Sequence, residues 1–336
     1  MDTLTRLLSD LVAIDSTNPD LVPGGAGEGQ VAAYIGEWLK RAGLDVEIVE
    51  AAPGRSNVVG IARGKGGGRK LVLNGHMDTV GAGEMQQPHQ PRIQDGRLYG
   101  RGAYDMKGGL AACMWAAAEA AKHRLRGDVI VQAVVDEEYA SIGTQALASR
   151  YKAEGAIVAE FTELRMILAH KGFVWLDVET LGKAAHGSRP DLGVDAITKM
   201  GGVLVGMEQL DTRLRSQPTH PLLGSGSIHA SLIHGGRELS SYPDHCALSV
   251  ERRTIPGETP ESVEAEVTDV LHQLGQRDTS FVAVLRRGLD RSPLETSPES
   301  GIAMTTQAAA AKVLGRTPEI AGVAFWTDAA LLSEAG

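Results

Sequence analysis

Hydrophobic residues near the start of the chain repeat with helical spacing. A first helix is predicted by apolar residues three or four positions apart, which are Leu4, Leu7, Leu8, Leu11 and Val12. The polar run 16–19, which closes with Pro19, ends this helix. Residues 31–42 predict a second amphipathic helix, and Gly43 ends it.

Beyond residue 45 the pattern changes to short β-type runs that alternate with helices. Strands are predicted at 46–49, 57–62 and 70–74, and an alanine-rich helix is predicted at 110–122. Continuous apolar runs at 129–135 and 156–158 are typical of strands that are buried on both faces. This alternation predicts an α/β fold, in which a mostly parallel sheet is flanked by helices.

A different pattern begins near residue 170. Further strands are predicted at 174–181, 227–233, 247–253 and 280–285, with helices at 191–209 and 261–274. Such an α+β module leaves a sheet edge that can pair with a second copy of the chain. After Pro293 the chain returns to helix, strand and helix. We therefore expect one catalytic domain formed by 1–169 and 289–336, with a lid or dimerisation domain inserted at 170–288.

Composition and charge narrow the classes of function. The 336 residues carry a net charge of -9 with acidic and basic side chains well mixed, which argues against a nucleic-acid surface. No apolar stretch approaches the length of a membrane span, and the start does not resemble a signal peptide, so we expect a cytoplasmic protein. The two cysteines, Cys113 and Cys246, have apolar or small neighbours and are predicted to be buried thiols.

Polar side chains interrupt the chain where the predicted strands end. These residues are His76 and Asp78, then Asp105 in a glycine-rich loop, then Glu137 and Glu138, and finally Glu160. The carboxyl ends of parallel strands form one rim of a sheet, which is where ligands bind. Taken one at a time, each residue is more typical of a surface side chain, a turn or a helix start than of a ligand. Together they predict a site.

Carboxylates gathered at one rim repel each other unless cations neutralise them. A histidine with carboxylate oxygens suits zinc or its close relatives, and a bridging Asp suits two ions about 3.5–4 Å apart. His76 and Asp78 are two residues apart on an extended chain, so their side chains share a face. The Asp78 carboxylate is therefore expected to accept the far ring N–H of His76 and to fix its tautomer.

Five ordered motifs resemble those of the M20 metallopeptidase family, the group of acetylornithine deacetylase, succinyl-diaminopimelate desuccinylase and carboxypeptidase G2. They read NGHMDTV, GRGAYDMKGGLAA, DEEYASIGTQAL, AIVAEFTEL and GKAAHGSRPDLGVDAI, and they cover roughly residues 70–200. Weaker similarity includes YPDHCALSVERRTIPGE and TDAALLSEAG in the second half. The glycine-rich segments match neither a P-loop nor a dinucleotide-binding fingerprint.

This resemblance implies a site with two divalent metal ions, with zinc expected and cobalt or manganese acceptable. One metal would be held by His76 and Glu160, and the other by Glu138, with Asp105 bridging both. Glu137 would be the general base and Asp78 the partner that orients His76. A cis peptide is expected directly after Asp105.

The resemblance also implies roles for residues of the inserted module. His186 would donate to the oxyanion, reaching the active site of a partner in a homodimer. Arg253 would bind a substrate carboxylate, although an ordinary salt bridge explains it almost as well. Ser240 stands where relatives tend to carry an asparagine that contacts substrate, which leaves the identity of the substrate open.

Two further departures bear on the metals. Ala159 and Phe161 flank Glu160, where relatives usually have Gly and Pro. The family also has a later histidine that completes the second metal site, whereas the last histidine here is His272, inside a predicted helix. Either the protein has one intact metal site, or the chain lacks the family's C-terminal end, which is the alternative that we expect.

The sequence thus predicts a metal-dependent hydrolase that removes the acyl group from an N-acyl amino acid. A carboxypeptidase or dipeptidase of the same family, acting on a short peptide, is the alternative enzyme. A non-catalytic homologue that binds a metabolite is the alternative outside enzymes. Glu137 favours the enzyme, because a homologue without activity commonly loses its base.

Overall fold

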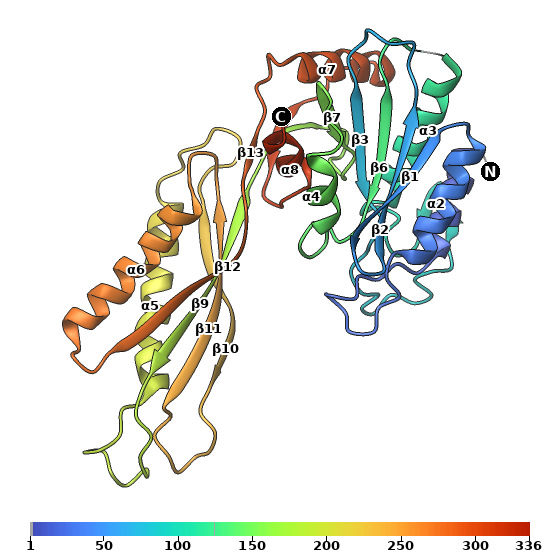
Figure 1. Cartoon of the computed structure of the whole chain (residues 1–336). Coiled ribbons are helices and arrows are strands. Elements are labelled where there is room, and N and C mark those ends of the chain that lie inside the picture. Colours follow the sequence, from blue (N-terminus) through green and yellow to red (C-terminus); the bar gives the residue numbers. More distant parts are fainter. Residues whose placement is uncertain (1–2, 124) are drawn as a thin grey trace. The chain divides into compact units, whose positions relative to one another are not determined.

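The computed structural model describes residues 3–123 and 125–336, which divide into two compact units (Figure 1). The first unit runs as far as Met166 and also includes Ser297–Glu319 and Thr327–Gly336. The second comprises Ile167–Thr296 and Ile320–Trp326. The roles predicted for the inserted module as a lid and a dimerisation domain stay predictions.

The first unit is built on a five-stranded sheet with the strand order β1-β2-β6-β3-β7. Its strands are β1 (Asp45–Ala52), β2 (Arg55–Ala62), β3 (Leu71–His76), β6 (Val129–Val134) and β7 (Gly155–Val158). β6, β3 and β7 are parallel neighbours, whereas β1 and β2 form an antiparallel hairpin whose second strand pairs antiparallel with β6. The α/β class is confirmed, and the sheet is mixed.

Helices cover both faces of this sheet. The cover of one face comprises α1 (Thr3–Ala13), α2 (Gly29–Arg41) and α3 (Lys107–His123), and that of the other comprises α4 (Ile142–Ala148) and α8 (Ala329–Glu334). β2 shows why two layers form, since Val58 packs with the first set of helices and Val59 with the second. Successive strand residues point to opposite faces, so a strand that is apolar throughout needs cover on both.

Two other elements of the first unit lie outside these layers. The short hairpin β4 (Arg92–Gln94) and β5 (Arg97–Tyr99) turns at Asp95 and Gly96, both with positive φ. Helix α7 (Gly301–Leu314) contacts the edge strand β7, where Gly155 lies against Ile302.

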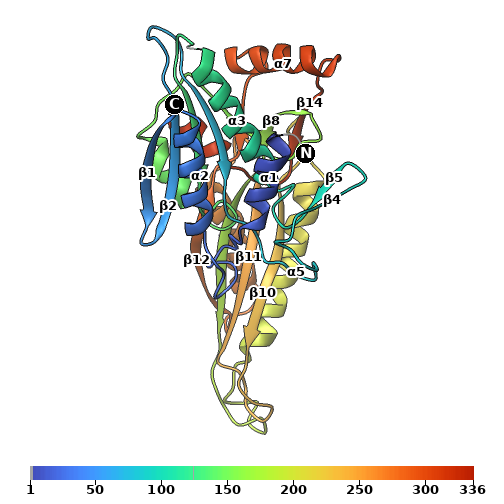
Figure 2. The same cartoon turned by 90° about the vertical axis from the view of Figure 1, so that its right-hand side faces the viewer.

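The second unit is a four-stranded antiparallel sheet with two helices on one face. The strand order is β10-β11-β9-β12, formed by β9 (Gly172–Leu181), β10 (Ser227–Gly235), β11 (His245–Thr254) and β12 (Val282–Arg291). Helices α5 (Ala196–Arg215) and α6 (Pro260–Arg277) bury their apolar sides on it, and Figure 2 shows α5 alongside β10 and β11. A small third sheet pairs β13 (Leu294–Glu295), β8 (Met166–His170) and β14 (Ile320–Val323).

The start of α5 differs from the sequence prediction by five residues. The helix begins at Ala196 instead of 191, because the Asp195 side chain caps it by accepting the Thr198 N–H. Val194 is instead paired with Lys183 in a short antiparallel bridge. Local pairing and the cap therefore decide where this helix begins.

Both cysteines are buried free thiols. Burial alone raises the pKa of Cys113 to about 12, which leaves it without a reactive thiolate at neutral pH. Among the described residues, no helix combines the length and hydropathy needed to cross a bilayer.

Candidate metal centre

His76 is the last residue of β3 and is almost completely buried, at 1% exposure. Its Nδ1 lies 2.9 Å from the backbone carbonyl oxygen of Asp78. Because a carbonyl can only accept, this contact assigns the ring proton to Nδ1. Nε2 is the ring nitrogen that faces the Asp105 carboxylate, which is 3.1 Å away, and it is the one that can ligate a metal. The ring is thus oriented as a metal-ligating histidine should be.

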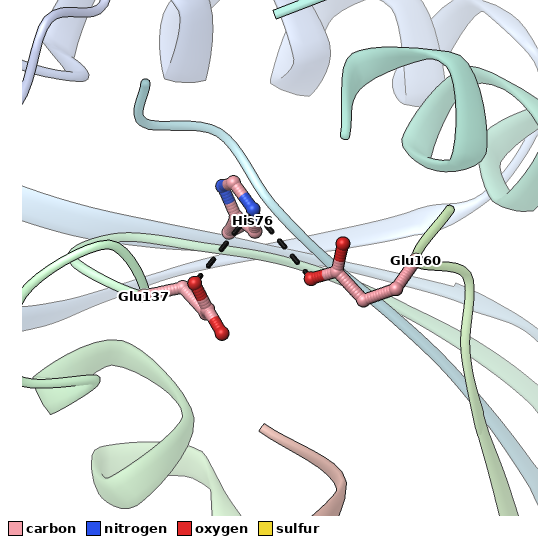
Figure 3. A group of neighbouring side chains, drawn as sticks. All are labelled: His76, Glu137 and Glu160. Atoms are coloured by element: carbon pink, nitrogen blue, oxygen red, sulfur yellow. Dashed lines mark ion pairs between the residues drawn. The ribbon is translucent and has the colours of Figure 1, made fainter. Parts of the chain in front are cut away.

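Two glutamates also face His76 Nε2 (Figure 3). The distances from Nε2 are 3.8 Å to Glu137 Oε2 and 3.6 Å to Glu160 Oε1. Glu137 lies in the loop after β6, and Glu160 lies two residues beyond the end of β7. One ligand atom from each of these three residues falls within 4.8 Å of the others, which is compact enough to hold a metal ion.

A second group of the same compactness consists of His76, Asp105 and Glu138. Asp105 lies in the loop before α3, and its peptide bond to Met106 is cis. The two groups share His76, so the four polar loops of the sequence analysis meet at one place. The structure therefore brings together all the predicted ligands and the predicted base of the first unit.

Gly109 allows α3 to approach the loop that carries Glu160. A Cβ atom at this position would lie 1.8 Å from the carbonyl oxygen of Ala159, the residue before Glu160. Any other side chain would push the helix and this loop apart. The glycines after Asp105 in the second motif therefore serve close packing.

Asp78 is completely buried and holds the loop after β6 in place. Its carboxylate accepts hydrogen bonds from the backbone N–H groups of Glu137 and Glu138, both at 3.2 Å, and from Asn18 Nδ2 at 2.7 Å. Asp78 Oδ1 lies 3.5 Å from His76 Nδ1, while the closer partner of the ring is the Asp78 carbonyl oxygen. The expected orienting contact is thus made chiefly by the backbone of Asp78, and the carboxylate adds its charge.

A buried ion-pair network supports this arrangement from behind. Asp136, with a left-handed φ of 68°, turns the chain so that the next two N–H groups face Asp78. Its carboxylate accepts from Asn18 Nδ2 and from Arg55, both at 3.0 Å. Arg55 also forms an ion pair with Glu28, which is 1% exposed. These buried, hydrogen-bonded charges fix the backbone that carries Glu137 and Glu138.

The site carries more negative charge than its own cations balance. Burial raises the pKa of Glu138 to about 7 and, with help from neighbouring carboxylates, that of Glu160 to about 7. Burial also raises the pKa of Glu137, and the nearby charges of Glu160 and Asp328 add to the effect. Divalent cations remove this cost, and a histidine with several carboxylates is a donor set that they accept. The residues present therefore fit the binding of divalent metal.

These raised values predict that metal affinity depends on pH. Below pH 7 the protein must release protons from Glu138 and Glu160 to bind an ion, so the affinity should fall as the pH falls. The loss should approach about tenfold per pH unit for each proton displaced. Calorimetric titration with Co²⁺ between pH 5.5 and 8 checks this, and an affinity that stays constant over the range would contradict it.

The three predicted residues of the inserted module lie in the second unit. His186 is exposed, and its Nδ1 accepts the Ser188 N–H at 3.2 Å. Ser240 is also exposed and lies beside the same loop, since its carbonyl oxygen accepts the Gly187 N–H at 2.7 Å. Arg253 donates to Glu251 at 2.7 Å and stacks over the Phe173 ring, so it forms the ordinary salt bridge considered above.

The sequence analysis assigned no role to several buried polar residues of this site. They are Asn18, Lys107, Asp136, Thr144 and Asp328. Lys107 donates to the carbonyl oxygens of Leu11 and Ile14 at the end of α1, and burial lowers its pKa to about 8. Asp328 follows an apolar strand, which is the same signal that identified Glu160. Its local pattern was therefore available in the sequence.

Comparisons with known proteins agree with this geometry. Residues 72–336 match the model of peptidase family M20/M25/M40. Acetylornithine deacetylase of Vibrio campbellii is 32% identical over 270 residues, which are 78% of this chain and 70% of that protein. N-formyl-4-amino-5-aminomethyl-2-methylpyrimidine deformylase of Bacillus subtilis is 29% identical, over 82% of this chain and 69% of that protein.

A solved structure shows the same fold. The tripeptidase of Staphylococcus aureus superposes with a TM-score of 0.79 at 22% identity, and the match covers 98% of this chain and 86% of that one. The extent of the family match and the identity to the deacetylase establish the relationship. The chain belongs to peptidase family M20/M25/M40, a family of hydrolases.

Proposed function

We propose that this protein is a divalent-metal-dependent amide hydrolase that removes the acyl group from an N-acyl amino acid. The observation that carries the proposal is the placement of His76 Nε2, which faces carboxylates from three different loops, two of which follow the parallel strands β6 and β7. The similarity to acetylornithine deacetylase and to a deformylase favours small N-acyl substrates over long peptides.

The donor sets suggest how the metals are held. His76 and Glu160 would ligate one ion and Glu138 the other, with Asp105 between them. Zinc is our first choice, and cobalt or manganese would accept the same donors. When bound, the ions supply Lewis acidity, which activates water and polarises the amide carbonyl.

Glu137 is the residue that we assign as the general base. Its backbone is fixed by Asp78, its side chain is 11% exposed, and burial raises its pKa. In our proposal it takes one proton from the attacking water, whose oxygen bonds to the amide carbon. The C–N bond then breaks as Glu137 returns that proton to the departing nitrogen, leaving a carboxylic acid and an amine.

Residues of the second unit would complete substrate recognition. Because His186 Nδ1 accepts a backbone N–H, its Nε2 carries the ring proton and can donate to a developing oxyanion. Arg253 would exchange its bond with Glu251 for the substrate carboxylate, and Ser240 would contribute a hydroxyl beside His186. These three roles rest on the family motifs and on the chemistry of the groups.

A panel assay tests the proposed function. The protein would be freed of metal, reloaded with Zn²⁺, Co²⁺ or Mn²⁺, and offered N-acetyl, N-formyl and N-succinyl amino acids together with dipeptides. We expect release of the free amino acid from at least one N-acyl substrate and loss of activity with EDTA. Faster cleavage of dipeptides would establish the peptidase alternative, and binding of two ions without any turnover would favour the non-catalytic homologue.

We further propose a homodimer that forms through the edge strand β10. This edge is exposed and apolar, with Leu232 at 60% and Ile233 at 49% exposure. Light scattering should give twice the 35.5 kDa of one chain, and Ile233→Arg should shift the protein to monomer because it places a charge on the paired edge.

The opposite edge strand, β12, offers a matched control for this prediction. Val282 is 50% exposed there, and Val282→Arg should leave the dimer intact. A wild-type protein that is monomeric at all concentrations would exclude the dimer, and with it a role for His186 in a partner's site.

A further inference from the structure

We propose that Asp328 is a positioning residue, which acts through Thr144 to fix the loop that carries Glu137 and Glu138. The inference rests on the proposed function for the roles of those two glutamates. Asp328 precedes α8, far along the chain from the loop it would control. The connection is made entirely by side-chain and backbone hydrogen bonds within the first unit.

The Asp328 carboxylate is placed inside the protein without serving its own helix. The residue is 1% exposed and occupies the N-cap position of α8, yet its side chain makes no capping hydrogen bond. Instead, Oδ2 accepts a short bond of 2.6 Å from the Thr144 hydroxyl. Oδ1 has no hydrogen bond of good geometry within the described part of the chain, although the nearby Ser141 hydroxyl favours the charged carboxylate and opposes the rise of its pKa. Burying a carboxylate is costly unless it is hydrogen-bonded, and this one does not cap its own helix. We therefore infer that its position is determined by the contact with Thr144.

Thr144 connects this carboxylate to the centre of the sheet. Its hydroxyl accepts a hydrogen bond from Asn74 Nδ2 at 3.0 Å and donates one to Asp328. Its single proton and one of its two lone pairs are therefore used in these bonds. Asn74 lies on β3 two residues before His76, and it also donates to Gln132 on β6 at 3.2 Å. The relay therefore joins α8, α4 and the strand that presents His76.

Helix α4 in turn determines where the glutamates lie. The Gly143 N–H donates to the carbonyl oxygen of Val135 at 3.2 Å, and the Ser141 N–H donates to that of Asp136 at 2.6 Å. The Ser141 hydroxyl reaches the Glu137 carbonyl oxygen at 3.4 Å. These bonds span the loop between the end of β6 and the start of α4, so a shift of α4 carries Glu137 and Glu138 with it.

The negative charge of Asp328 is unfavourable next to the other carboxylates of the site, and a neutral hydrogen-bond acceptor in its place would avoid this repulsion. Burial raises its own pKa to about 6, and its charge raises the pKa of both Glu137 and Glu160. A neutral acceptor would hold Thr144 without repelling the two glutamates. The shorter, charge-assisted bond gives Thr144 a stiffer anchor, which is what a precisely placed base requires.

The test compares substitutions at both ends of this contact. Thr144→Val keeps the shape and removes the hydroxyl, Thr144→Ser keeps the hydroxyl, and Asp328→Ala removes the acceptor. Thr180→Val is the matched control, because Thr180 is equally buried in the second unit and its hydroxyl donates to the Ala196 carbonyl oxygen at 2.8 Å. Each variant would be loaded with Co²⁺, and its visible spectrum, metal content, Tm, kcat and KM would be measured.

We expect Thr144→Val and Asp328→Ala to change the Co²⁺ spectrum and to lower kcat by about 10- to 100-fold, with KM within about twofold. Because both act through one contact, the double variant should lose no more than the worse single variant. Thr144→Ser should restore the wild-type spectrum and most of kcat. Thr180→Val should lower Tm without altering the spectrum.

Two results would overturn the proposal. One is a folded Thr144→Val protein with the wild-type spectrum and the wild-type kcat. The other is a double variant whose losses multiply, which would show that the two residues act independently. If the wild-type protein hydrolyses nothing in the panel, the proposed function fails, and the Co²⁺ spectra alone then decide whether the relay positions the site.

Discussion

Replacing Glu137 with glutamine should lower kcat by about 10²- to 10⁴-fold while two metal ions remain bound. The amide keeps the size and the planar shape of the side chain but cannot accept the proton of the attacking water. At the upper end of this range the loss corresponds to about 5 kcal/mol of transition-state stabilisation. KM should change little, because the substitution removes a group whose contribution is made during the reaction.

Glu37 provides the matched control for this substitution. It is a glutamate on α2 whose side chain is 66% exposed and pairs with Lys40 at the surface, and Glu37→Gln should have full activity. Metal content by elemental analysis separates the two roles that the geometry allows for Glu137, which also lies within ligand distance of His76 and Glu160. Loss of one ion in Glu137→Gln would make this residue a ligand and would transfer the role of base elsewhere.

Replacing Asp105 with alanine should weaken metal binding itself, and catalysis only as a consequence. The Asp105 carboxylate lies 3.1 Å from His76 Nε2 and belongs with Glu138 to the second compact group. Without it, the site loses the carboxylate that would contact both ions, and metal affinity should fall by at least about 100-fold. Activity should fall in proportion to occupancy and should recover in part when the metal concentration is raised.

Thermal unfolding gives an independent measure of the same effect. Ions that bind only the folded protein stabilise it by about 2.7 kcal/mol when their concentration is 100 times Kd. EDTA should therefore lower the Tm of the wild-type protein and leave that of Asp105→Ala unchanged. Asp45→Ala is the control, since Asp45 is 63% exposed and pairs with Arg63 at the surface. Retention of two ions by Asp105→Ala would show that the assignment of the bridge is wrong.

The buried polar network explains why the two glutamates of one loop can have different roles. Asp78 accepts both of their backbone N–H groups, so Glu137 and Glu138 leave the loop in fixed and different directions. Glu137 then groups with Glu160, and Glu138 groups with Asp105. Removing the Asn18 or Asp136 contacts would loosen this geometry without touching any ligand.

Much of the fold follows from local patterns in the sequence. Apolar runs such as 129–135 predict strands buried on both faces, and Val129–Val134 is such a strand, since every one of its residues is buried. Polar residues directly after these runs predict the rim where His76, Glu137 and Glu160 meet, since parallel strands end at the same edge. The spacing of apolar residues and the position of the polar residues after them are local features of the sequence. They can therefore be interpreted without knowledge of the tertiary contacts.

The antiparallel hairpin of β1 and β2 and the start of α5 were decided by pairing between segments. β-type runs do not state which neighbour they will pair with or in which direction. Asp195 became a cap because Val194 was held by Lys183, a contact that no helical periodicity contains. Sequence patterns fix element types more firmly than element boundaries.

The roles of Asn18, Thr144 and Asp328 required the tertiary structure. Local sequence explains each of them without a functional role: Asn18 follows a helix, Thr144 lies within a helix, and Asp328 precedes a helix. Their partners are 60 or more residues away, as with Asn18 and Asp78 or with Thr144 and Asp328. The sequence by itself therefore determined which residues could bind metal, because ligand chemistry belongs to the side chain. Only the tertiary structure decided what holds those ligands in place, because buried hydrogen bonds depend on which distant groups meet.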